Sequence, residues 1–283
     1  MSSSIYCRVC KSLLFKIKYI KGEVTGDDVA LFKCKNCDSY FSKVELVKKT
    51  LINYESGSID VYMNENYVSN RVQDIILYSQ SKNWLPSKDV NFLDIGCGVG
   101  WSLIIANRNG FNAYGIEPNK LASKFGNDDL KVNVINSLFR PDIFKEKKFD
   151  FIMMDQVLEH VHDPLKMIVD AFGLLKPGGV FFLGVPPLDW SRKLLSTSFQ
   201  FNNKIMRYLE NNRYFNKLIL LARKYDTFFG PEGHINYFST KAISILAEHC
   251  NAKLVQQYHF NRKRVKYFQP LKLSTGSFFF IKR

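Results

Sequence analysis

The stretch FLDIGCGVG, residues 92–100, places three glycines and one aspartate within nine positions. Residues 90–95 are predicted to form a short buried strand, and a helix is predicted to start at Val99. The glycines lie on the turn between these two elements; they are Gly96, Gly98 and Gly100. Bare backbone can adopt positive φ there and lets a ligand approach the helix N-terminus. Tight turns of purely structural use share this pattern, so the rest of the chain has to decide between the two interpretations.

Strand-like and helix-like segments alternate after this turn. Further strands are predicted at residues 112–117, 131–135, 148–155 and within 176–187, and an antiparallel hairpin is predicted from 252–260 and 274–283. Helices are predicted at residues 70–85, 163–175 and from Ser239 onward. This alternation predicts an α/β fold with a doubly wound, mostly parallel, seven-stranded sheet of Rossmann-like type. Ligands of such sheets bind at the carboxyl ends of the strands.

An acidic residue, Glu117, ends the second predicted strand 17 positions after Gly100. A carboxylate at that place can accept hydrogen bonds from both hydroxyls of a ribose. The alternative is a solvated acid in a turn. Together with the glycine turn, Glu117 indicates a nucleoside site, which would also fit a dehydrogenase.

The later motifs are more specific. LDIGCGVG, YGIEPN, FDFIMMDQVLEHVHDPLKMI and LLKPGGVFFLGVP follow one another from Asn91 to Val185, and in order and spacing they resemble the class I S-adenosylmethionine-dependent methyltransferases. The resemblance implies S-adenosylmethionine as cofactor, with the glycine turn and Asp94 at its methionine end and Glu117 on the ribose. It implies further residues around the adenine, namely Pro118, Asn119, Asn136, Ser137, Asp155 and Gln156.

Four cysteines stand near the N-terminus as two C-x2-C pairs separated by 23 residues; they are Cys7, Cys10, Cys34 and Cys37. Each pair suits a tight knuckle that points two thiolates at one metal, and two knuckles complete a tetrahedral zinc site. Disulfides are the competing interpretation. A closed four-thiolate site leaves zinc no open position, so the metal is expected to be structural. Residues 1–50 are therefore predicted to form a zinc ribbon, with a turn at residues 25–27.

The ribbon and the LEH…DP stretch together are similar to bacterial methyltransferases of secondary metabolism and surface-sugar gene clusters. These include sugar C-methyltransferases that act on nucleotide-linked keto-sugars. The chain has YDTFFGPEGHINYFS at residues 225–239, which resembles their FDTIYHEHLSYFS stretch and retains its last histidine as His234. The resemblance implies a sugar as acceptor; it leaves open whether oxygen or carbon is methylated.

Methyl transfer to a hydroxyl or a carbon acid requires a base, and histidine suits this task near neutral pH. His160 follows the fourth predicted strand, and His234 lies in a loop before the helix that starts near Ser239. Both are predicted to be catalytic. The alternative for His160 is packing or helix capping.

The domain boundaries follow from these assignments. We expect a helical linker at residues 51–86 and the methyltransferase domain at 87–283. Within it, residues 188–234 are rich in aromatic and basic side chains and are predicted to form a helical lid over the acceptor. A structural cap or an amphipathic surface that touches a membrane is the alternative.

The charge and composition of the chain restrict the classes of partner that it is expected to bind. Forty Lys and Arg against 26 Asp and Glu give a formal charge of +14, which suits nucleic acid or an anionic surface, although the charges are scattered. The N-terminus lacks the features of a signal peptide, and no apolar run is long enough to cross a membrane. We therefore expect a cytoplasmic methyltransferase of a small or carrier-linked molecule, with a sugar as the favoured acceptor. The alternatives are an RNA methyltransferase that grips RNA with its ribbon and a cofactor-binding scaffold without activity.

Overall fold

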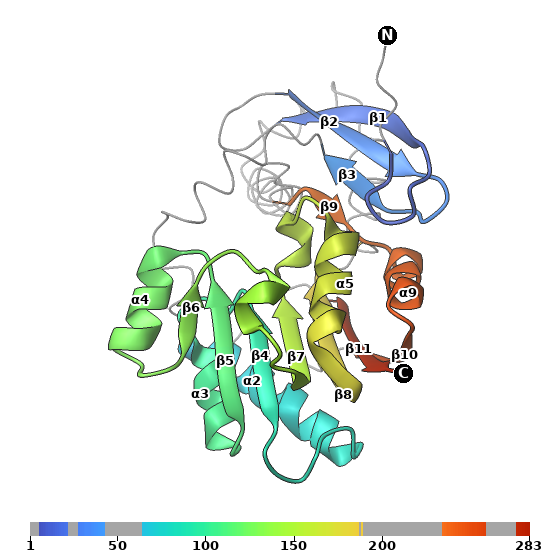
Figure 1. The fold of residues 1–283 in the computed structure, drawn as a ribbon. Coiled ribbons are helices and arrows are strands. Elements are labelled where there is room, and N and C mark those ends of the chain that lie inside the picture. Colours follow the sequence, from blue (N-terminus) through green and yellow to red (C-terminus); the bar gives the residue numbers. More distant parts are fainter. Residues whose placement is uncertain (1–5, 22–27, 43–63, 187, 189–233, 259–275) are drawn as a thin grey trace, which may run out of the picture.

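The computed structural model describes residues 6–21, 28–42, 64–186, 188, 234–258 and 276–283 (Figure 1). The predicted ribbon turn at residues 25–27 lies outside the described residues. So does the predicted lid, apart from Leu188 and His234 at its two ends.

A seven-stranded sheet forms the centre of the structure, in the order β10-β11-β8-β7-β4-β5-β6. Its strands are β4 (Asn91–Ile95), β5 (Asn112–Glu117), β6 (Val134–Asn136), β7 (Phe149–Asp155), β8 (Leu175–Val185), β10 (Ala252–Tyr258) and β11 (Gly276–Lys282). The pairs from β8 to β6 are parallel, whereas β11 runs antiparallel to β8 and to β10. The predicted doubly wound sheet with a terminal hairpin is confirmed.

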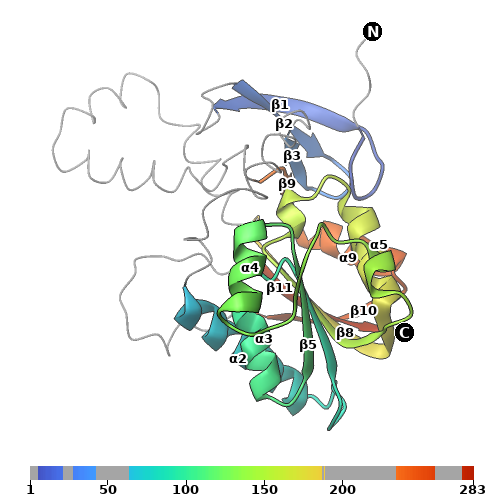
Figure 2. The same cartoon turned by 60° about the vertical axis from the view of Figure 1, so that its left-hand side comes forward.

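Helices cover both faces of this sheet. They are α2 (Glu65–Ser81), α3 (Trp101–Arg108), α4 (Lys120–Asp128), α5 (Pro164–Leu174) and α9 (Thr240–His249), with short 3₁₀ turns η3 (Pro141–Phe144) and η4 (Leu158–His160). Figure 2 shows α2, α3 and α4 on one side of the sheet and α5 and α9 on the other. Three helices start at a side-chain cap, because the side chains of Asn119, Asp163 and Ser239 each accept a hydrogen bond from the backbone N–H three residues later.

Strand side chains alternate between the two cores. Phe92 packs with α2 and α3, whereas Leu93, its neighbour in β4, packs with α5 and α9. The same alternation separates Phe182 from Phe181 in β8. Strands that are buried on both faces read as continuous apolar runs, which is why the sequence identified them.

Helix α2 packs in the same core as the sheet. Val72, Ile75 and Ile76 are buried together with Phe92 and Phe279 of the strands. We propose to count this helix with the sheet domain, although the sequence suggested a linker over residues 51–86.

A second, smaller sheet holds the N-terminal segment. Its order is β1 (Leu14–Lys21), β2 (Asp28–Cys34), β3 (Tyr40–Ser42) and β9 (Asn236–Tyr237), and all three pairs are antiparallel. The sequence predicted the ribbon strands but not β9, which comes from the C-terminal part of the chain and lies beside β3 in Figures 1 and 2. Ribbon residues share one core cluster with α5 and α9, so the ribbon is packed onto the sheet domain.

Among the described residues, no helix is long and apolar enough to cross a membrane.

Two helical glycines give a matched test of the packing. A Cβ on Gly126 of α4 would lie 2.7 Å from the Val99 carbonyl oxygen and 2.9 Å from Cγ2 of Val134, whereas a Cβ on Gly173 of α5 meets nothing within 4 Å. We expect Gly126→Ala to lower the free energy of unfolding by about 1–3 kcal/mol through overpacking. Gly173→Ala should raise it by about 0.5–1 kcal/mol through helix propensity. Urea denaturation measures both; equal effects would contradict the described packing of α4.

Candidate functional site

The glycine turn joins β4 to α3 and has the predicted left-handed backbone. The φ angles are 81° at Gly96, 55° at Gly98 and 93° at Gly100. Two of these positions are also closed to side chains by the protein itself. A Cβ on Gly96 would lie 2.4 Å from Cγ2 of Val157, and one on Gly100 would lie 2.7 Å from Cγ2 of Val132. The missing side chain at Gly96 therefore lets the loop after β7 pack directly against the turn, and the one at Gly100 does the same for the segment that leads into β6.

Glu117 ends β5 and faces this turn. Its side chain is 3% exposed. Oε2 accepts a hydrogen bond from the Gly98 N–H (3.0 Å), and Oε1 accepts one from the Asn119 N–H (2.8 Å). Burial raises the pKa of Glu117, and the two backbone N–H groups oppose that shift. Each oxygen keeps lone pairs that can accept a further hydrogen bond, as two ribose hydroxyls would require.

Asp94 lies at the end of β4, 4% exposed. It accepts a short hydrogen bond from the Ser102 hydroxyl in the first turn of α3. Burial raises the pKa of Asp94 to about 7, and the nearby charges of Asp155 and Glu117 add to the shift. The carboxyl group is therefore poised to ionise when a cation is placed beside it.

Asp155 ends β7 and is held by a guanidinium. Arg71 of α2 donates from Nε to Oδ2 (2.5 Å) and from Nη2 to Oδ1 (2.9 Å). Its Nη2 also lies 3.3 Å from the Ser277 hydroxyl in β11. The next residue, Gln156, has a φ of 59° and donates its N–H to the Gly184 carbonyl.

The predicted adenine residues after β5 and β6 lie next to one another. Nδ2 of Asn136 donates to the carbonyl oxygens of Glu117 and Pro118, at 3.0 Å each. The Ser137 N–H donates to the Glu117 carbonyl (3.2 Å). Asn136 therefore fixes the end of β6 to the loop that follows Glu117.

His160 and His234 come together although 73 residues separate them in the sequence. Their ring centroids lie 4.9 Å apart at an interplanar angle of 61°. Glu159, beside His160, is fully buried, and neither of its carboxylate oxygens has a hydrogen-bond partner among the described residues. Nε2 of His160 lies 3.9 Å from Glu159 Oε1, and burial raises the pKa of this glutamate to about 8.

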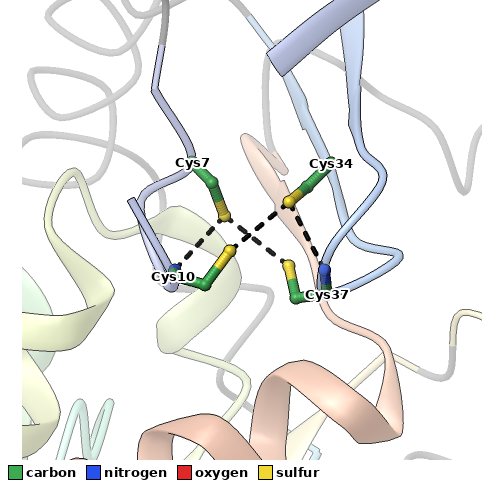
Figure 3. A group of neighbouring side chains, drawn as sticks. All are labelled: Cys7, Cys10, Cys34 and Cys37. Atoms are coloured by element: carbon green, nitrogen blue, oxygen red, sulfur yellow. Dashed lines mark hydrogen bonds between the residues drawn. The ribbon is translucent and has the colours of Figure 1, made fainter. Parts of the chain in front are cut away.

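The four N-terminal cysteines point toward one another from two knuckles (Figure 3). Sγ of Cys7 lies 3.6 Å from that of Cys37, and Sγ of Cys10 lies 3.4 Å from that of Cys34. All four sulfur atoms lie within 4.8 Å of one another, and none is in a disulfide. A tetrahedral zinc with bonds of about 2.3 Å would place its sulfur ligands about 3.8 Å apart, so the arrangement fits that metal.

Two residues of this region were not predicted from the sequence. Ser102 lies two residues after Gly100, in the first helical turn, and that spacing could have indicated it. Arg71 carried no such signal, because it meets a partner 84 residues away. Glu159 was expected to orient the loop after β7 rather than to react; its complete burial depends on elements that are distant in the chain.

Comparison with known proteins bears on this geometry. The family model described as "Methyltransferase domain" matches residues 64–257. The ubiquinone biosynthesis O-methyltransferase of Pelagibacter ubique (strain HTCC1062) is 32% identical over 126 residues, which are 43% of this chain and 50% of the relative. The protein of the same name from Actinobacillus pleuropneumoniae serotype 5b (strain L20) is 34% identical over 113 residues, 36% of this chain and 47% of the relative. The chain thus spans about half the length of these curated relatives.

Two solved structures are similar in fold. The magnesium protoporphyrin IX methyltransferase of Synechocystis PCC 6803 with bound SAM has a TM-score of 0.52 and 10% identity, covering 85% of this chain and 99% of its own. The 1,6-didemethyltoxoflavin-N1-methyltransferase of Burkholderia thailandensis has a TM-score of 0.53 and 13% identity, covering 94% and 99%.

The sequence motifs, the strand order and the family match agree. The chain belongs to the methyltransferase domain family and has the fold of the class I S-adenosylmethionine-dependent methyltransferases.

Proposed function

We propose that the protein transfers a methyl group from S-adenosylmethionine to a hydroxyl of a small or carrier-linked acceptor, with a sugar as the acceptor class. The names of the relatives support an oxygen acceptor, because those that match at 32–34% identity are named O-methyltransferases. Two imidazoles that lie together after β7 could supply the base that a hydroxyl acceptor needs, as a carbon acid also would. The sugar rests on the resemblance of the ribbon and of residues 225–239 to sugar methyltransferases.

The observation that carries this proposal is the pairing of His160 with His234. His160 belongs to η4, which begins three residues after the end of β7, and Val157 in the connecting loop packs against the glycine turn. His160 thus lies three residues after a residue that contacts this turn, which supports a place for the pair on the methionine side of the cofactor. An imidazole there is suited to remove the proton of a hydroxyl as the methyl group arrives.

The chain's own residues have distinct tasks in this scheme. S-adenosylmethionine, when bound, supplies an electrophilic methyl group on a sulfonium. Glu117 would accept hydrogen bonds from the ribose hydroxyls, and Asp94 would offer its carboxylate to the ammonium of the methionine part. The residues after β5, β6 and β7 would hold the adenine, namely Pro118, Asn136, Ser137, Asp155 and Gln156. His234 takes the acceptor proton, and His160 holds the acceptor or shares that proton.

The substrate class is tested with a panel of acceptors. Nucleotide-linked sugars, catechols and tRNA are each incubated with the protein and S-adenosylmethionine, and S-adenosylhomocysteine formation and the product mass are measured. Methylation of a nucleotide-linked sugar is expected. Methylation of tRNA alone would support the RNA methyltransferase instead, and a lack of S-adenosylhomocysteine binding would contradict any methyltransferase.

The pH dependence of cofactor binding follows from Asp94. Because its pKa is raised to about 7, the carboxyl is protonated in the free protein below that pH, and a bound ammonium favours the ionised form. Affinity for S-adenosylhomocysteine should therefore fall by up to about tenfold per pH unit below pH 7 and be level above it. Calorimetric titration should show this, together with proton release. Asp94→Asn should bind more weakly and lose the dependence, whereas exposed Asp128→Asn should retain it; a level affinity down to about pH 5.5 would exclude this role for Asp94.

The metal assignment predicts one zinc per chain. We propose that Cys7, Cys10, Cys34 and Cys37 bind it as thiolates, which makes its binding part of the folding of the ribbon. Cys34→Ser should abolish zinc binding and destabilise the N-terminal segment, whereas Cys250→Ser, at an isolated cysteine, should retain the metal. Elemental analysis measures both. S-adenosylhomocysteine binding should persist in each, and a disulfide within the cluster of freshly purified reduced protein would refute the assignment.

Base catalysis predicts a specific loss of turnover. His234→Ala should lower kcat by about a hundredfold or more and leave S-adenosylhomocysteine binding unchanged. The acidic limb of the pH–rate profile should disappear in whichever variant, His234→Ala or His160→Ala, removes the base. His249→Ala, in the exposed last turn of α9, is the control. Full activity in both of the first two variants would show that positioning alone supports the transfer.

A further inference from the structure

The segment that carries His234 is attached to the ribbon. It continues directly into β9, which pairs antiparallel with β3 of the ribbon. The Ser42 N–H at the end of β3 donates to the Ile235 carbonyl (3.0 Å). The position of His234 therefore depends on a strand that the N-terminal ribbon supplies.

The other side of the same segment is attached to the loop that carries His160. The Ile235 N–H donates to the Glu159 carbonyl (2.9 Å). Nδ2 of Asn236 donates to the carbonyl of Leu158 (3.0 Å), the first residue of η4, and to that of Val161 (2.6 Å), which follows η4. The residues next to each imidazole are thus tied together by three hydrogen bonds.

Arg8 joins these two attachments. It lies inside the first cysteine knuckle, between Cys7 and Val9. Its Nη1 donates to the Asn236 side-chain oxygen (2.8 Å) and to the Ile235 carbonyl (3.1 Å), while Nη2 donates to the Ser42 carbonyl (2.9 Å). The amide oxygen of Asn236 accepts a hydrogen bond from the Arg8 guanidinium, so its NH₂ group points toward the carbonyls of Leu158 and Val161. The planar guanidinium of Arg8 therefore fixes the orientation of the Asn236 side chain.

We propose that Arg8 is a positioning residue for the His160–His234 pair, so that the geometry of the cysteine knuckle determines the geometry of the acceptor side of the site. This inference depends on the proposed function at one point only: it assumes that His160 and His234 act on the acceptor. Arg8 itself lies in the ribbon and acts through Asn236 and Ile235.

The second knuckle provides a matched control. Lys35 stands between Cys34 and Asn36, at the position that corresponds to Arg8 in the first knuckle. Lys35 is exposed, and its Nζ lies 4.3 Å from the centroid of the Phe15 ring, on the ribbon itself. Replacing Lys35 removes a cation from a knuckle without touching β9 or η4.

The deciding measurement is the imidazole ¹⁵N spectrum of the full chain with bound S-adenosylhomocysteine. The chain has five histidines, so His160→Ala and His234→Ala assign their own signals by difference. Arg8→Ala should shift both signals while zinc content and S-adenosylhomocysteine affinity stay as in the unaltered protein. Lys35→Ala should leave both signals in place. Unchanged signals in Arg8→Ala, or equal shifts in Lys35→Ala, would overturn the proposal.

If Arg8→Ala loses zinc, its spectrum no longer tests the proposal, and Arg8→Lys provides the test instead. It retains the charge and the stem but lacks the fork that holds Asn236 and Ser42 together. We expect metal retention, a smaller shift of the same two signals and partial recovery relative to Arg8→Ala. A lysine variant with zinc and an unaltered spectrum would overturn the proposal equally.

Turnover separates this inference from the proposed function. With the nucleotide-linked sugars as acceptors, Arg8→Ala should lower kcat by about ten- to a hundredfold, the scale of a small misplacement. It should cause no further loss in the His234→Ala background. A further loss there would contradict action through His234. Shifted imidazole signals with unchanged kcat would retain Arg8 as a positioning residue and remove the histidine pair from catalysis.

Discussion

Four carboxyl groups lie near one another at the carboxyl edge of the central sheet; three are buried, Asp155 is partly exposed, and the charge of each is compensated in a different way. Asp155 has the guanidinium of Arg71, and Glu117 has two backbone N–H groups. Asp94 has one hydroxyl and a raised pKa, and Glu159 has no hydrogen-bond partner among the described residues. Burying a charge is costly unless it is paired. The edge therefore favours cationic ligand groups, and a sulfonium cofactor with an ammonium at one end matches that preference.

The proposed acceptor side of the site is assembled from three parts of the chain. The loop after β7 supplies His160, the segment before α9 supplies His234, and the ribbon holds the second against the first. Ser239 adds a further contact between the ribbon and α9. Its hydroxyl caps the start of α9 and also donates a hydrogen bond to the Cys37 carbonyl. The ribbon is thus joined to the sheet domain by hydrogen bonds as well as by the packing of the shared core cluster.

Most of the fold could be predicted from the sequence because it is encoded locally. Apolar runs mark the buried strands, Asp163 and Ser239 mark helix starts, and the glycine turn requires positive φ that few other residues adopt. The spacing within each C-x2-C pair likewise predicts a local geometry, the cysteine knuckle. What escaped prediction is non-local: β9 is only two residues long, and both Arg71 and Arg8 act on partners far away in the sequence. The hydrophobic periodicity of the sequence cannot indicate such contacts, because a single hydrogen-bonding side chain leaves no repeating pattern.

The pairing of β3 with β9 also has a consequence for folding during synthesis. Ser239 and its partner Ser39 are 200 residues apart. At about 5–20 residues per second, roughly 10–40 s pass between their emergence from the ribosome. Throughout that interval β3 is the open edge of a three-stranded ribbon sheet, and such edges invite pairing with other chains. Long-range closure of this kind slows folding, so early binding of the proposed zinc by the cysteine knuckles would stabilise the nascent ribbon until its fourth strand arrives.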